Sequence, residues 1–307
     1  MARMLVFGAG GQVGRELVLR DGRNGWQVQG FDRAALDVTR SAEVARAVAD
    51  LRPAVVVNAA AYTAVDAAET DRDAAFAINA DAAGAIAAAC ARARVPLIHI
   101  STDYVFDGRK AGAYVEDDAI APLSVYGKSK AAGERAVRDV GGAHVILRTA
   151  AVFAAHGKNF VRTMLRLAGE RPELRVVADQ VTCPTAAADI ATAIAAIAGR
   201  LVQPAVPADA LGTFHYCGAP ATSWHGFAEA IVDRAAARGR PRPPVTAIPA
   251  SDYPVPAPRP ANSVLDCGKL ARVHRIGQPD WRAALDDVLA VLVDGPPDAP
   301  TSREASR

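Results

Sequence analysis

A glycine-rich turn between a short apolar run and a helical pattern constrains the fold of this chain more than any other feature. The apolar residues Met4–Phe7 precede Gly8, Gly11 and Gly14, which have Gly-x-x-Gly-x-x-Gly spacing, and a helical pattern begins at Arg15. Glycine permits a tight turn and lets the backbone approach a pyrophosphate at the N-terminus of the following helix. A plain strand-to-helix turn is the alternative, but its place after an N-terminal strand favours a dinucleotide site.

Apolar runs typical of strands alternate with helical segments in the first half of the chain. They are Met4–Phe7, Gln27–Phe31, Ala54–Val57, Val95–Ile100 and His144–Leu147. This alternation predicts an α/β fold of the Rossmann type, a doubly wound parallel sheet with helices on both faces. The expected dinucleotide-binding domain covers residues 1–148.

After Leu147 proline becomes frequent and the expected strands become shorter, namely Leu174–Val177, Gly212–Tyr216 and Val245–Ile248. We therefore expect a smaller α/β substrate-binding domain over residues 149–294, with a segment near 211–217 returning to the first sheet. Residues 295–307 are polar and rich in proline and serine, which predicts a disordered tail.

Bulk properties indicate a globular protein with no nucleic-acid or membrane partner. The chain has 307 residues, 51% of them hydrophobic, and a net charge of +2, which gives no argument for nucleic-acid binding. Its four cysteines form no Cys-x-x-Cys pair, which argues for a reducing compartment. The apolar run Ala82–Ala91 is too short to span a bilayer, and the early first strand leaves no room for a signal peptide. A cytoplasmic location is expected.

Thr102, Tyr126 and Lys130 supply a hydroxyl, a phenol and an ammonium in an order that suits carbonyl reduction. Thr102 follows an expected strand, so its hydroxyl should emerge at the carboxyl end, where ligands bind in such sheets. Tyr126 and Lys130 are four residues apart and share one helix face. A tyrosine has a pKa of about 10, and a nearby ammonium lowers that pKa towards neutrality. An exposed helix pair is the alternative interpretation.

The ends of the second and third strands carry further candidates for cofactor contacts. Asp32 suits the adenosine ribose of NAD, whereas the adjacent Arg33 suits the 2′-phosphate of NADP, so both cofactors remain open. Asp37 and Val38 are placed near the adenine, with a role before the next helix as the alternative for Asp37. Small residues in Asn58–Thr63 leave room for the ribose and nicotinamide. Asn58 is equally well suited to hydrogen-bonding unpaired backbone groups at the end of the strand.

These motifs together resemble the dTDP-4-dehydrorhamnose reductase family, within the extended short-chain dehydrogenases/reductases, from about Met4 to Leu292. The glycine turn and the Tyr/Lys pair identify the superfamily. The segments Thr102–Gly108 and Arg259–Ser263 are more specific to this family.

The resemblance implies reduction of a 4-keto nucleotide sugar by NADPH or NADH. Tyr126 would be the general acid, Lys130 would lower its pKa and hold the nicotinamide ribose, and Thr102 would orient the carbonyl. Implied cofactor contacts are Gly8, Gly11, Gln12, Val13, Ala60, Ala61, Tyr62 and Thr63. Implied substrate contacts are Thr102, Asp103, Phe106, Tyr126, Arg259 and Asn262, with Arg259 on the nucleotide's pyrophosphate.

Three positions bear on the exact reaction. Related dehydratases carry Asp-Glu after the threonine, but here Tyr104 follows Asp103, which disfavours elimination. Ala151 stands where the family has a tryptophan that packs against the sugar, which leaves the sugar open. Glu16 matches a magnesium ligand of some members, but Ala188 replaces a second acid, so no metal is assigned.

The leading expectation is the last step of dTDP-L-rhamnose synthesis, the reduction of the C4 ketone of dTDP-4-dehydro-β-L-rhamnose. Two alternatives are a reductase of a different 4-keto nucleotide sugar and a non-catalytic nucleotide-binding regulatory subunit. The complete Thr/Tyr/Lys set argues against the regulatory subunit. Monomer and homodimer both remain open.

Overall fold

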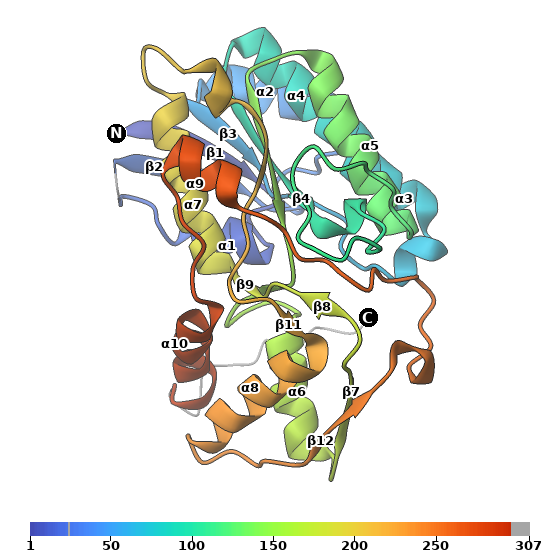
Figure 1. Ribbon diagram of the computed structural model, residues 1–307. Helices are drawn as coiled ribbons and strands as arrows, with labels where there is room; N and C mark the ends of the chain where they lie inside the picture. The colour runs from blue at the N-terminus through green and yellow to red at the C-terminus, as the bar shows by residue number, and fades with distance from the viewer. Residues whose placement is uncertain (24, 296–307) are drawn as a thin grey trace.

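A parallel sheet with helices on both faces forms the first part of the protein (Figure 1). The computed structural model describes residues 1–23 and 25–295, so the expected tail, apart from Gly295, lies outside the described residues. Six strands in these residues pair in the order β10-β5-β4-β3-β1-β2, all parallel. Their bounds are β1 Ala2–Phe7, β2 Trp26–Phe31, β3 Val55–Asn58, β4 Leu97–Thr102, β5 His144–Thr149 and β10 Gly212–His215. The arrangement confirms the predicted fold class.

Alternate residues of each strand pack on opposite helix layers, because side chains of a strand point to its two faces in turn. Met4 and Val6 of β1 pack on one layer, and Leu5 and Phe7 on the other. The first layer is α1 Gln12–Val18, α7 Ala187–Leu201 and α9 Gly268–His274; the second is α2 Ser41–Leu51, α4 Ala82–Ala93 and α5 Val125–Val140. Both faces are covered, which is why a central strand such as β3 is buried along its whole length, whereas β2 at the edge carries two glutamines.

An alanine-rich helical run extends over Arg72–Ala93, through α3 Arg72–Phe76, a π-helical turn Ala77–Asp81 and α4. By length and composition alone this run could cross a membrane, and it is longer than the apolar run picked out in the sequence. Half of its most apolar 18-residue stretch is nevertheless buried inside the protein, as in a core helix. The helix therefore does not indicate a membrane protein.

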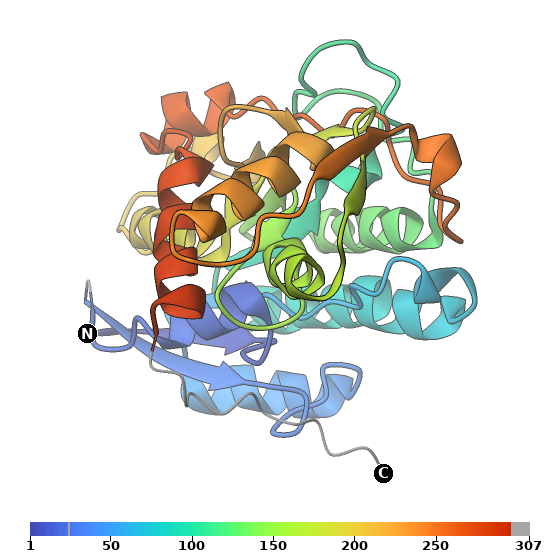
Figure 2. The same ribbon diagram turned by 90° about the horizontal axis from the view of Figure 1, so that it is seen from below.

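Apart from β10, α7 and α9, which join the sheet and its first helix layer, the second half of the chain packs around its own core across the carboxyl end of the sheet, as the view from below shows (Figure 2). Its helices are α6 Phe160–Glu170, α8 Trp224–Ala236 and α10 Trp281–Val293. Its strands form two-stranded pairs, β12 Val245–Ile248 with β7 Leu174–Val177, β11 Thr222–Ser223 with β8 Val181–Thr182, and β6 Val152–Phe153 with β9 Thr185–Ala186. Short 3₁₀ turns lie at Ala67–Glu69, Asp103–Val105, Ala208–Ala210 and Ala250–Asp252.

Candidate functional site

The glycine turn after β1 is packed too closely to accept side chains. A Cβ on Gly8, whose φ is +80°, would lie 2.4 Å from the backbone nitrogen of Ala60, and one on Gly14 would lie 2.2 Å from the carbonyl oxygen of Gly8. Contacts under 3.0 Å essentially never occur at a real Cβ. The bare turn thus brings the start of α1 against β1 and β3, as a dinucleotide cradle requires.

The acidic residues after β2 lie beside this turn or just beyond it. The Asp32 carboxylate accepts a hydrogen bond from the backbone of Ala35 at 2.9 Å, and its Cβ lies near Gly10. Asp37 accepts hydrogen bonds from the backbone and hydroxyl of Thr39, which lower the pKa of its carboxyl. These bonds lie before α2 and do not cap it, because the residue preceding α2 is Arg40.

The loop after β3 is held by two amide side chains. Asn58 accepts a hydrogen bond from the backbone of Ala60 at 3.1 Å, which is the backbone-binding role weighed for it from the sequence. Asn79 exchanges hydrogen bonds with the backbone of Tyr62, at 2.8 and 3.1 Å, and donates to the Ser129 hydroxyl at 2.9 Å. Asn79 thereby ties the 58–63 loop to α5. Our sequence analysis missed it, although it is the one amide in an alanine-rich helix.

Thr102, Tyr126 and Lys130 converge at the carboxyl end of β4. Thr102 is the last residue of that strand, and its hydroxyl donates to the Asp103 carboxylate at 2.8 Å and also contacts the Tyr126 phenol. Lys130 is buried and donates from Nζ to the carbonyl of Ile100 at 2.7 Å. The first turn of α5 is set by Ser124, whose hydroxyl accepts from the backbone of Gly127, so the helix presents Tyr126 to the strand end.

Burial controls the protonation of this group. It raises the pKa of Tyr126 to about 12, although the contact with Thr102 lowers that pKa. The direction is opposite to the one expected from Lys130, because desolvation of the phenolate outweighs other influences here. Burial also lowers the pKa of the Lys130 ammonium to about 8 and raises that of Asp103 to about 6. Tyr126 is therefore a neutral phenol, the form that can donate a proton.

A buried ion pair lies behind Lys130. Arg148 donates to Glu134 from Nε and Nη2 at 2.8 and 2.7 Å, and both side chains are almost fully buried. Ser101 donates to the same carboxylate at 2.6 Å, and His215 lies 3.3 Å from Nη1 of Arg148. Hydrogen bonds and the charge of Arg148 hold the pKa of Glu134 low despite its burial. The network ties α5, β4 and β5 together under the site.

The residues expected to contact the substrate differ in their burial and in their hydrogen-bond partners. Asp103 lies beside Thr102, whereas the Phe106 ring is fully buried, stacked on Tyr114 and under the Arg148 guanidinium. Asn262 donates to the carbonyls of Lys110 and Gly112 and accepts from the backbone of Val264, so its amide binds loops. Arg259 pairs with Asp66. Contacts of these residues with a substrate stay predictions.

Ala151 departs from the pattern of the family that the sequence resembles, whereas Glu16 matches one of its magnesium ligands. Ala151 has a φ of +42°, a left-handed conformation that side chains disfavour. Glu16 accepts a hydrogen bond from Nε2 of His156 at 2.8 Å. In the described part of the chain no group of three His, Cys, Asp or Glu side chains could hold a metal ion.

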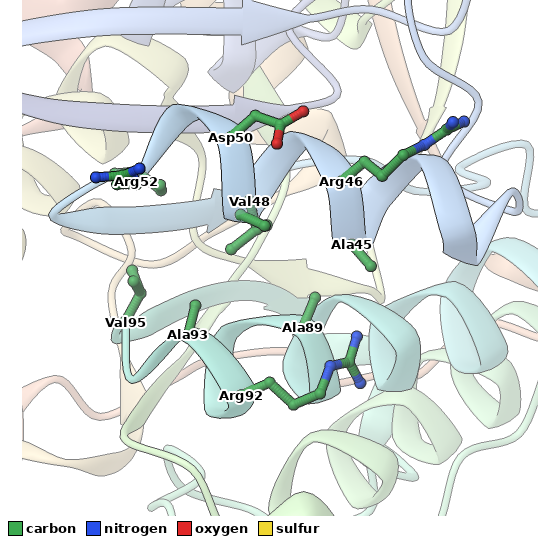
Figure 3. A pocket seen from close by; sticks show the side chains of 11 residues that line it. Ala45, Arg46, Val48, Asp50, Arg52, Ala89, Arg92, Ala93 and Val95 are labelled. Atoms are coloured by element: carbon green, nitrogen blue, oxygen red, sulfur yellow. The ribbon is translucent and has the colours of Figure 1, made fainter.

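An open groove of about 690 Å³ lies between α2 and α4 (Figure 3). Ala45 and Val48 point towards α4, and Asp50 points away. The groove includes Pro53 and Val95, which precede β3 and β4, so it lies at the amino ends of the strands. Because Thr102 is the last residue of β4, the Thr102–Tyr126–Lys130 group lies at the carboxyl ends of the strands. The groove and this group are therefore at opposite ends of the sheet's strands.

Comparison with known proteins points to one family. A model described as the RmlD substrate binding domain matches residues 2–293. The dTDP-4-dehydrorhamnose reductase of Burkholderia thailandensis is 49% identical over 288 residues, which cover 92% of this chain and 96% of that protein.

Solved structures agree with this match. The dTDP-4-dehydrorhamnose reductase of Clostridium acetobutylicum superimposes with a TM-score of 0.87 at 34% identity, covering 94% of this chain and 99% of that one. The Bacillus anthracis enzyme in complex with NADP gives a TM-score of 0.86 at 34% identity, covering 94% and 98%.

Proposed function

The chain belongs to the family described as the RmlD substrate binding domain, and from that premise we propose its function. The protein reduces the C4 ketone of dTDP-4-dehydro-β-L-rhamnose to give dTDP-L-rhamnose, with NADPH as the cofactor. The observation that carries the proposal is the convergence of Thr102, Tyr126 and Lys130 at the carboxyl end of β4.

The residues present fit a dinucleotide. A Cβ on Gly8 or Gly14 would obstruct the turn, and Gly11, Gln12 and Val13 lie between these glycines at the start of α1. We assign the pyrophosphate to this turn, the adenosine to Asp32, Arg33, Asp37 and Val38, and the nicotinamide half to Ala60–Thr63. When bound, the cofactor supplies the hydride for the reduction.

The side chains of the site supply the proton and the orientation. Tyr126, a neutral and partly buried phenol, donates its proton to the oxygen on C4 as that oxygen gains negative charge. Thr102 orients the same oxygen by a hydrogen bond. The Lys130 ammonium favours the phenolate that is left after the transfer and would bind the nicotinamide ribose.

Nucleotide-sugar chemistry places the protein among soluble biosynthetic enzymes, and its four buried, unbridged cysteines support a cytoplasmic location. It acts as a monomer or a homodimer.

The test is NADPH oxidation by the purified protein, supplied with dTDP-4-dehydro-6-deoxyglucose and a 3,5-epimerase. We expect oxidation that requires the epimerase and yields dTDP-rhamnose. Oxidation without the epimerase would assign a different 4-keto sugar, which the missing aromatic at Ala151 would explain. Cofactor binding with no oxidation of any such sugar would reject the reductase in favour of a regulatory subunit.

The rate is expected to fall as the pH rises through about 8, because the Lys130 ammonium, with its pKa lowered to about 8, is present below that pH and lost above it. Profiles of kcat/KM against pH check this for the wild type and Lys130→Arg, in which the charge persists and the basic limb should move to higher pH. Lys128→Met, at an exposed position on the same helix, is the control. An unmoved limb in Lys130→Arg would assign the titration to another group.

A further inference from the structure

Asp66 and Arg259 form a two-pronged ion pair between segments 193 residues apart. Nη1 of Arg259 donates to Oδ1 of Asp66 at 2.8 Å, and Nη2 donates to Oδ2 at 2.7 Å. The backbone of Ala257 also donates to Asp66, at 3.2 Å. Asp66 lies in the loop that follows β3 and the cofactor-lining residues, so it holds the 257–259 segment against the first half of the protein.

The pairing leaves one edge of the Arg259 guanidinium available. A guanidinium has five N–H groups in a fixed plane. Two of them bind Asp66, and a further Nη1–H donates to the carbonyl of Ala257 at 2.6 Å. No hydrogen bond within the described residues uses the N–H of Nε or the second N–H of Nη2. These two lie on the same edge, which is the geometry that accepts two oxygens of a phosphate.

The ion pair lies close to the reacting group. Glu69, three residues after Asp66, accepts a hydrogen bond at 2.8 Å from the backbone of Val125, the residue that precedes Tyr126. The rings of Tyr104 and Tyr126 meet edge to face, with centroids 5.7 Å apart. Arg259 is only 22% exposed, so its guanidinium is held near the site and does not move freely in solvent.

We propose that Asp66 is a positioning residue, which holds Arg259 so that its Nε–Nη2 edge binds the diphosphate of the nucleotide sugar. The inference rests on the proposed function, because the diphosphate belongs to that substrate. A guanidinium fixed before binding loses less side-chain freedom when the phosphate arrives, and this strengthens binding. The Asp66 carboxylate is itself a like charge for the diphosphate, so its effect on affinity must come through Arg259.

The experiment measures the binding of dTDP and of thymidine by calorimetry to the wild type, Asp66→Asn, Arg259→Gln and the double variant. An asparagine keeps the size of Asp66 but offers only one oxygen, so the two-pronged pair is lost. We expect Asp66→Asn to weaken dTDP binding by about threefold to tenfold while thymidine binding is unchanged. In steady-state kinetics KM should rise by the same factor with kcat preserved. The control is Asp233→Asn on α8, which breaks a more exposed pair with Arg242.

The signs of the outcomes separate the inference from its premise. Tighter dTDP binding by Asp66→Asn would show that only the charge of Asp66 matters and would overturn the inference. An additional loss from Asp66→Asn in the Arg259→Gln background would also overturn it, since Asp66 would then act independently of Arg259. If Arg259→Gln leaves dTDP binding unchanged, the assigned contact with the substrate is wrong. If the wild type binds no dTDP, the proposed function itself fails.

Discussion

Tyr126→Phe is expected to lower kcat by about 10²–10⁴-fold, because it removes the phenolic proton that a general acid transfers to the C4 oxygen. The ring and its packing remain, so NADPH binding should change little. Steady-state kinetics and cofactor titration of the purified variant test both parts of the prediction.

Tyr104→Phe is the matched control for this substitution. Tyr104 is also a partly buried phenol, and it packs edge to face against Tyr126. Loss of its hydroxyl should leave kcat close to that of the wild type. Equal turnover by Tyr126→Phe and the wild type would reject Tyr126 as the proton donor, and an equal loss in both variants would indicate a general effect of the missing hydroxyls on packing.

Arg148→Met is expected to lower the free energy of unfolding by about 3 kcal/mol, because it leaves the buried Glu134 carboxylate with the partly exposed Arg138, at 3.3 Å, as its cation. Glu134 is fully buried, and Arg148 supplies two of its hydrogen bonds. The substitution is also expected to disturb the position of Lys130, since Glu134 lies on α5 one turn after it. Urea denaturation followed by circular dichroism measures the change.

Two further variants calibrate the loss in Arg148→Met. Replacing both partners, Glu134→Leu with Arg148→Met, should destabilise the protein less than the two single changes added together, because no lone charge stays buried. Arg166→Met breaks an exposed pair with Glu170 on α6 and should cost under about 1 kcal/mol. A similarly small cost for Arg148→Met would mean that Arg138 by itself compensates the charge of Glu134.

The strands and the reacting group could be predicted from the sequence because both depend on local patterns. Each expected strand is present, with its ends shifted by at most two residues. One such shift matters, because β4 extends to Thr102 and so places that hydroxyl at the carboxyl end of the strand. The four-residue spacing of Tyr126 and Lys130 places both on α5 whatever the rest of the chain does.

The partners of the site residues could not be predicted in this way. Asn79 reaches the loop at Tyr62, and Arg259 reaches Asp66, through folds of the chain that no local pattern describes. The protonation of Tyr126 was likewise beyond the sequence, because it depends on how much water the packed halves exclude.

The sequence by itself determined the α/β sheet, the glycine turn and the identities of the proposed proton donor and its neighbours. These follow from residue spacing, backbone sterics and the period of apolar residues, which act over a few positions. The tertiary structure alone decided which charges pair and which groups are buried: Glu134 with Arg148, Arg259 with Asp66, and Tyr126 as a neutral phenol. Charge pairing and desolvation depend on distance in space, and only the packed chain sets that distance.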